Sequence, residues 1–110
     1  MKKLGFIGGG NMAKAIIKGL LKQNFASDNL FVVDPNERCQ KHFLDLNIFS
    51  SGTVDPVVSN VDILILAVKP QILPDVLLSI NPFLKPNHVI VSIVAGITIA
   101  QVRKYLRDVS

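Results

Sequence analysis

The sequence has little cysteine and no long apolar run, and each absence excludes a class of protein. Its one cysteine, Cys39, cannot form a disulfide within the chain, which excludes a disulfide-stapled fold and favours a reducing compartment. We interpret Cys39 as a part-buried small residue rather than a catalytic thiol. No apolar stretch reaches the roughly 18 residues that a membrane span needs, and the apolar part of MKKLGFIGGG is too short for a secretory signal. We therefore expect a cytoplasmic protein with no membrane partner.

The sequence also lacks the residues that usually form metal sites and nucleic-acid sites. The two histidines and the cysteine are widely scattered, so they do not form a metal site. The net charge of +4 would suit a nucleic acid, but Lys14, Lys18 and Lys22 recur every four residues, as expected of the solvated face of a helix. Aromatic residues make up only 6% of the chain and do not alternate with basic ones, so no stacking platform is predicted. We expect no metal and no nucleic-acid partner.

What the sequence does have is enough apolar content for one domain with a real core. Hydrophobic residues make up 49% of the 110 positions, and the mean hydropathy is +0.42. Short apolar runs alternate with helical patterns along the whole chain, which predicts an α/β fold with a mainly parallel sheet between two helical layers. The expected strands are residues 4–7, 30–33, 47–49, 61–68 and 88–94. The expected helices begin near residues 11, 37, 55, 74 and 98.

Several residues have an expected place in these elements. A buried stripe of the first helix should contain Met12, Ala13, Ile16, Ile17 and Leu20. That helix should end near Gln23, with Asn24 as its C-cap. Leu44 should anchor the second helix, which runs to residue 46, and His42 should be exposed. Asp55 should cap the third helix. His88 has no partner that the sequence identifies. In the last helix, Thr98 and Gln101 should form a capping box, with Ile97 and Val102 as a hydrophobic staple.

The first strand passes directly into a glycine turn and a helix. Gly8-x-Gly10-x-x-Ala13 fits the G-x-G-x-x-G/A fingerprint of dinucleotide-binding folds. Gly8 would make the tight turn, Gly10 would let a pyrophosphate approach the backbone, and Ala13 would let the helix lie close to the strand. The helix N-terminus would then face the phosphates. An acidic residue, Asp34, ends the next strand at about the spacing that the fingerprint requires. The pattern predicts a Rossmann-type domain that binds a dinucleotide.

In a sheet of order 3-2-1-4-5, the strand order reverses between the first and fourth strands, and ligands bind there. Residues 8–12, 68–70 and 93–96 would line this crevice, and Asp34 would accept hydrogen bonds from the adenosine ribose. A carboxylate repels a 2′-phosphate, so Asp34 favours NAD(H). Arg38 weakens that inference because it could pair with a phosphate or stack on adenine, or it could be an exposed helix residue. Lys69 could be catalytic or could merely end the strand with Pro70; we favour a role in lining the cofactor through the backbone of Val68 and Lys69.

Three segments together resemble a known family. GFIGGGNMAKAIIKGL, LAVKPQ and VSIVAGIT are similar to the N-terminal domain of pyrroline-5-carboxylate reductase, and the resemblance covers essentially the whole chain. It implies an oxidoreductase of proline biosynthesis, an amino-acid biosynthesis enzyme that reduces L-1-pyrroline-5-carboxylate to L-proline with NAD(P)H. The cofactor contacts that it implies are Ile7, Gly8, Gly9, Gly10, Asn11, Met12, Asp34, Ala67, Val68, Lys69, Pro70 and Ile93.

The chain departs from that family in two ways. Many members have a small polar residue at the position of Asp34, so their usual preference for NADP over NAD is in question here. Members also carry a second, helical domain that forms a homo-oligomer and most of the substrate pocket, and we expect it after residue 110, where this sequence has nothing. The catalytic residues are therefore not assigned. Two other hypotheses stay open: a sensor module that binds NAD(P) without catalysis, and the N-terminal domain of an enzyme similar to 3-hydroxyacid dehydrogenases.

Overall fold

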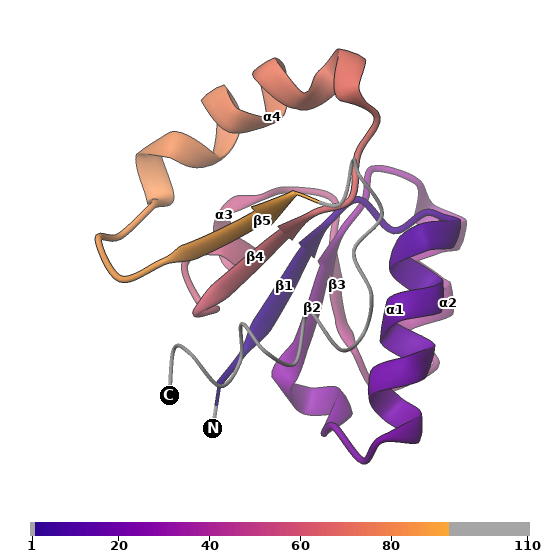
Figure 1. The fold of residues 1–110 in the computed structure, drawn as a ribbon. Coiled ribbons are helices and arrows are strands. Elements are labelled where there is room, and N and C mark those ends of the chain that lie inside the picture. The colour runs from indigo at the N-terminus through magenta and orange to yellow at the C-terminus, as the bar shows by residue number, and fades with distance from the viewer. Residues whose placement is uncertain (1, 93–110) are drawn as a thin grey trace.

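The computed structural model describes residues 2–92 of the chain, and these form a five-stranded parallel sheet. The strands are β1 (Leu4–Ile7), β2 (Leu30–Val33), β3 (Phe49–Ser51), β4 (Ile63–Leu66) and β5 (Val89–Ser92). They lie side by side in the order β3-β2-β1-β4-β5, with every neighbouring pair parallel (Figure 1). The predicted α/β class and strand order are confirmed.

Helices cover both faces of the sheet. They are α1 (Asn11–Lys22), α2 (Glu37–Leu44), α3 (Asp55–Val58) and α4 (Leu73–Ile80), with 3-10 turns at Ser27–Asn29, Pro70–Ile72 and Asn81–Phe83. Figure 1 shows α1 and α2 on one face and α3 and α4 on the other. The strand order explains this division. The chain adds strands in one direction from β1 to β3 and in the other direction from β4 to β5, and right-handed crossovers in opposite directions place their helices on opposite faces of the sheet.

Two apolar clusters fill the space between the sheet and its helices. On one face, Leu4 and Phe6 of β1 pack with Ile17 of α1 and Phe43 of α2. On the other face, a second cluster joins alternate strand residues to α3 and α4; it contains Ile7, Val33, Leu64, Leu66, Val57, Val58 and Ile80. Because both faces are covered, β4 is apolar at every position and fully buried.

Two predicted core residues are exposed instead. Met12 is 50% exposed and Leu44 is 53% exposed, whereas Phe43 is completely buried and anchors α2. Met12 lies in the first turn of α1, and the buried face of this helix is formed by Ala13, Ile16, Ile17 and Leu20. In α2 the buried face is set by how the helix crosses β2, and this places Phe43 inward and Leu44 outward. The other members of the predicted α1 stripe are buried.

Several boundaries differ from the sequence expectations. The third strand begins at Phe49 rather than at residue 47, because Asn47 adopts a left-handed conformation (φ 62°) that ends the turn after α2. The C-cap of α1 is Gln23, and Asn24, with φ 67°, is the left-handed residue that follows it. Asp55 is the first residue of α3 rather than its cap. The strand β4 is shorter than expected and β5 begins one residue later than expected, while residues 93 and 94 of the expected fifth strand and the expected helix at 98–106 lie outside the described residues.

His88 has partners that the sequence did not reveal. Its Nδ1 accepts a hydrogen bond of 2.8 Å from the backbone N–H of Lys85. The proton of a neutral ring therefore lies on Nε2, which is 2.9 Å from the carbonyl oxygen of Val61 and donates to it. His88 thus links the loop before β5 to Val61, two residues before β4.

Candidate cofactor site

The carboxyl ends of β1, β2 and β4 meet at the point where the strand order reverses. The backbone N–H of Gly8 donates to the carbonyl oxygen of Val33 at 2.7 Å. The backbone N–H of Ala67 donates to the carbonyl oxygen of Ile7 at 2.8 Å. These bonds bring three predicted segments together: the glycine turn, the residues that follow β2, and residues 67–70. Ile93, the remaining predicted contact, lies outside the described residues.

The first two glycines of the turn are required by the packing of the protein itself. Gly8 has φ +100°, and a Cβ there would lie 2.5 Å from the carbonyl oxygen of Ala67. A Cβ on Gly9 would lie 2.8 Å from Cε2 of Phe43 and 3.0 Å from Sγ of Cys39. Neither position has room for a larger residue, whatever binds nearby.

Gly10 differs from both, because a Cβ built on it would meet no atom of residues 2–92 within 4 Å. The residue is exposed, and its φ of −73° and ψ of −168° suit any amino acid. Protein packing therefore does not explain a glycine here. The open space in front of it is what a group approaching the backbone would fill, as predicted for a pyrophosphate.

The N-terminus of α1 is prepared for an anion. Gly10 is its N-cap, so no side chain satisfies the first N–H groups, and the first turn contains no acidic residue. These N–H groups and the positive end of the helix dipole point toward the open space at Gly10. Asn11 and Met12, both predicted contacts, are exposed in this turn. The residues present thus fit a dinucleotide phosphate.

Asp34 follows β2 and reaches the glycine turn. Its Oδ2 accepts a hydrogen bond of 2.9 Å from the N–H of Gly9, and its Oδ1 accepts one of 2.8 Å from the N–H of Asn36. Each carboxylate oxygen keeps a second lone pair, so Asp34 can still accept from a ribose hydroxyl. The ribose contact of Asp34 stays a prediction, and the bond to the glycine turn was not predicted, because it depends on how two distant loops meet.

A hollow of about 390 Å³ lies beside Asp34, and Lys14, Asn36, Arg38 and Cys39 complete its lining. Of these four, only Arg38 was predicted at the site. Asn36 could have been recognised from its position before Glu37, since its side chain caps α2 by accepting from the N–H of Cys39 at 3.1 Å. Nothing in the sequence pointed to Cys39. Burial and, next, the negative charge of Asp34 raise the pKa of the Cys39 thiol, so the thiol stays protonated at neutral pH.

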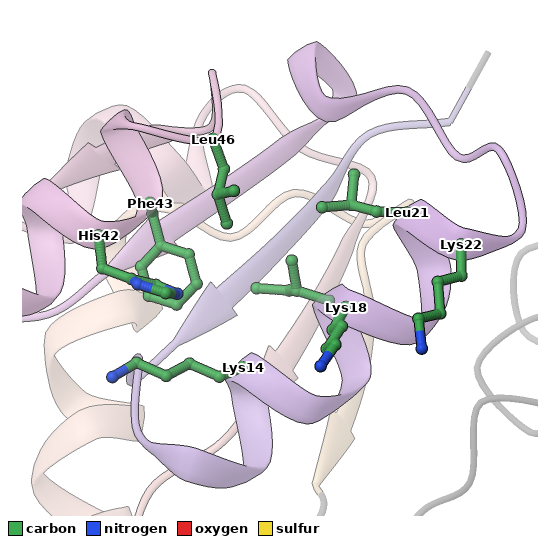
Figure 2. A pocket seen from close by; sticks show the side chains of 8 residues that line it. Lys14, Lys18, Leu21, Lys22, His42, Phe43 and Leu46 are labelled. Atoms are coloured by element: carbon green, nitrogen blue, oxygen red, sulfur yellow. The ribbon is translucent and has the colours of Figure 1, made fainter.

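Lys14 also borders a second, more apolar groove of about 580 Å³ between α1 and α2 (Figure 2). The lining of this groove consists of Lys14, Ile17, Lys18, Leu21, Lys22, His42, Phe43 and Leu46. The three lysines come from α1, and Figure 2 shows the side chains of His42 and Phe43 on the facing helix. Lys18, Lys22 and His42 are exposed, as expected of a solvated surface. Lys14 is half-buried and lies between this groove and the hollow at Asp34.

The segment after β4 forms the other side of the crevice. Ala67 and Val68 are half-buried, whereas Lys69 and Pro70 are exposed. Lys69 is extended (φ −65°, ψ 146°) and precedes the 3-10 turn at Pro70–Ile72. Its role as a cofactor contact through the backbone remains a prediction. Within residues 2–92, no three His, Cys, Asp or Glu side chains are grouped to hold a metal, and no helix is long and apolar enough to cross a bilayer.

Comparisons with known proteins show the family and the fold of the chain. Pyrroline-5-carboxylate reductase from Haemophilus influenzae is 38% identical over 88% of this chain and 36% of its own length. The structure of a pyrroline-5-carboxylate reductase from Coxiella burnetii matches with a TM-score of 0.81 and 25% identity, over 96% of this chain and 40% of that one. A Plasmodium falciparum pyrroline carboxylate reductase with NADP bound matches with a TM-score of 0.72 and 29% identity, over 94% and 37%.

The chain therefore spans little more than a third of the length of the relatives that it matches. A family model described as NADP oxidoreductase, coenzyme F420-dependent, matches residues 3–96. This match covers most of the chain, including the glycine turn, Asp34 and residues 67–70. The chain belongs to this family of NADP oxidoreductases, and its fold is the family's Rossmann-type, NAD(P)-binding fold.

Proposed function

We propose that residues 1–110 are the cofactor-binding part of an enzyme that reduces L-1-pyrroline-5-carboxylate to L-proline. The observation that carries the proposal is the open space at Gly10, in front of an uncapped helix N-terminus, in a chain whose relatives are pyrroline-5-carboxylate reductases. NAD(P)H, when bound, supplies the hydride for this reaction. The residues described here bind and orient it.

Each part of the cofactor has a proposed place. The pyrophosphate lies against Gly8 to Met12, where the N–H groups of the first turn of α1 can donate to it. The adenosine ribose lies at Asp34 and the hollow beside it. The nicotinamide lies along Ala67 to Pro70 and near Ile93, on the β4 side of the crevice.

The choice between NADH and NADPH depends on opposing charges in one hollow. The carboxylate of Asp34 can accept hydrogen bonds from a free ribose and repels a 2′-phosphate. Lys14 and Arg38 line the same hollow and would attract that phosphate. Asp34 is half-buried and already fixed by two hydrogen bonds, whereas Arg38 is exposed. We therefore propose that Asp34 prevails and that the protein favours NADH.

The proposal extends to the whole enzyme. The part of the relatives that this chain does not match would supply the substrate pocket and the contacts of a homo-oligomer, in a second, helical domain. The substrate would be a small molecule, and a cytoplasmic location would suit both proline synthesis and the single free cysteine. Catalysis requires the substrate carbon to be held next to the nicotinamide, and this orientation supplies about 7–11 kcal/mol in favourable cases.

Calorimetry with NADH and NADPH tests the proposal. Purified residues 1–110 should bind both nucleotides, NADH more tightly, and should show no proline-dependent reduction of NAD or NADP above a buffer blank. Asp34→Ser should weaken NADH binding by about 1.5–3 kcal/mol, the value of a hydrogen bond to a charged group, and should weaken NADPH binding less. Asp28→Ser, an equal loss of charge at the exposed Asp28 before β2, is the control and should change neither affinity.

Each outcome has a distinct meaning. Wild-type protein that binds neither nucleotide would contradict the proposed function. A strong wild-type preference for NADPH would contradict only the role of Asp34 and would favour Arg38 as the determinant. Saturable turnover by residues 1–110 would show that these residues contain their own substrate site.

A further inference from the structure

The backbone N–H and carbonyl group of Gly9, which belong to two successive peptide groups, both bond to side chains from another part of the chain. Its N–H donates to Oδ2 of Asp34 at 2.9 Å, and its carbonyl oxygen accepts from the thiol of Cys39, with Sγ at 2.8 Å. Both bonds are part-buried. Asp34 follows β2 and Cys39 lies in the first turn of α2. The β2–α2 connection is therefore hydrogen-bonded to the β1–α1 connection at two points.

The β2–α2 connection is itself fixed by hydrogen bonds. Oδ1 of Asp34 accepts from the N–H of Asn36 at 2.8 Å, and Oδ1 of Asn36 accepts from the N–H of Cys39 at 3.1 Å. The side-chain amide of Gln40 donates to the carbonyl oxygen of Asp34 at 2.8 Å. Asp34 and Cys39 are thus held in place within their own segment as well as by their bonds to Gly9.

The fingerprint offers no reason for a glycine at position 9, which is its first unspecified position. The structure offers one, because Phe43, Cys39 and Val32 all lie within 3.2 Å of a Cβ built there. Only a residue without a side chain lets α2 approach closely enough for the Cys39 thiol to reach the carbonyl oxygen. The tight packing and the two hydrogen bonds therefore belong to one arrangement.

This arrangement stands directly in front of the phosphate site. Gly9 precedes Gly10, the N-cap of α1, so the orientation of the Gly9 peptide sets the path of the backbone into the first turn of α1. We propose that Asp34 and Cys39 are positioning residues that hold the Gly9 peptide and so preorganise the glycine turn for a pyrophosphate. The inference rests on the proposed binding of NAD(P)H and adds a role that the ribose contact of Asp34 does not include.

The two roles predict different results. NADH and NADPH share the pyrophosphate and differ at the ribose, so loss of the positioning role weakens both by the same factor. Loss of a ribose contact changes the ratio of the two affinities. Cys39 is the better residue to vary, because Asp34 is itself the proposed acceptor for the ribose, whereas the thiol of Cys39 donates to Gly9 and a hydroxyl can replace it as donor.

The test compares Cys39→Ala with Cys39→Ser. Nuclear magnetic resonance would follow hydrogen exchange of the Gly9 amide without nucleotide, and calorimetry would give both affinities. Cys39→Ala should speed Gly9 exchange and weaken NADH and NADPH equally, by about two- to tenfold, as expected for the loss of one neutral hydrogen bond. Cys39→Ser should restore slow exchange and wild-type affinity. His42→Ala, at an exposed position of α2, is the matched control and should change neither measurement.

A merely structural Cys39 would give another pattern. If the thiol only fills space, Ser and Ala would behave alike, Gly9 exchange would follow the loss of global stability, and the proposal would be overturned. Unchanged Gly9 exchange in Cys39→Ala would overturn it as well, even with nucleotide binding intact. Wild-type protein that binds neither nucleotide would overturn both this role and the proposed function. Binding with no Cys39 effect would overturn this role alone.

Discussion

The three consecutive glycines should respond to substitution in three different ways. Gly8→Ala introduces a side chain at φ +100°, which costs about 1–2 kcal/mol in backbone strain, and places its Cβ 2.5 Å from a backbone oxygen that cannot move aside. Gly9→Ala overpacks the contact with Phe43 and should cost about 1–3 kcal/mol. Gly10→Ala meets no atom of the described part of the chain within 4 Å and should change the free energy of unfolding by less than about 1 kcal/mol.

At Gly10, substitution should affect nucleotide binding rather than stability. Gly10→Val should fold with near wild-type stability yet lose detectable NADH binding, because its branched side chain fills the space through which the pyrophosphate reaches the backbone. Urea unfolding and calorimetry on the same samples provide both values. The reasoning fails if Gly10→Val binds NADH with wild-type affinity, or if Gly10→Ala destabilises the protein as much as Gly8→Ala.

Two further predictions concern α2. Phe43→Ala should lower the free energy of unfolding by about 3–5 kcal/mol because Phe43 is fully buried, whereas Leu44→Ala should change it by no more than about 0.5 kcal/mol; equal effects in urea unfolding would contradict the observed face of α2. Burial and the Asp34 charge raise the pKa of Cys39 in the folded protein, while Lys14 opposes this shift, so the unfolded chain loses its thiol proton first as the pH rises. The contribution of the protonated Cys39 thiol to the free energy of unfolding should be fully present below the ordinary thiol pKa of about 8.5. It should decline as the pH rises through the pKa of Cys39 in the folded protein. Cys39→Ser should remove that part of the slope, and an identical pH profile for both proteins would refute the shift.

The sequence predicted the sheet well because its signals are local and repeated. Alternating strand and helix patterns, together with a glycine fingerprint after the first strand, leave few arrangements other than β3-β2-β1-β4-β5. Helical periodicity was less reliable at the ends of helices. It assigned Met12 and Leu44 to the core, but burial there depends on where the sheet stops and on how each helix crosses it.

The site could be predicted as segments but not as contacts. The glycine turn, Asp34 and residues 67–70 were placed correctly at one edge of the sheet because parallel strands end together. The bonds from Asp34 and Cys39 to Gly9 could not be foreseen, since they join residues that are 25 or more positions apart through loop conformations with no sequence signature. The bond from His88 to Val61, 27 positions away, was missed for the same reason.

The central position of the first strand has a consequence for how the protein folds. Leu4 pairs with Leu30 on one side and with Ile63 on the other, so β1 can join β2 through a short connection but must close a loop more than twice as long to join β4. Until β4 pairs with β1, one edge of β1 is unpaired. The crevice beside the phosphate-binding turn also lacks the side that the residues after β4 form. Formation of the β1–β4 pair should therefore be the slow, long-range step of folding, and the cofactor site should appear only when that step is complete.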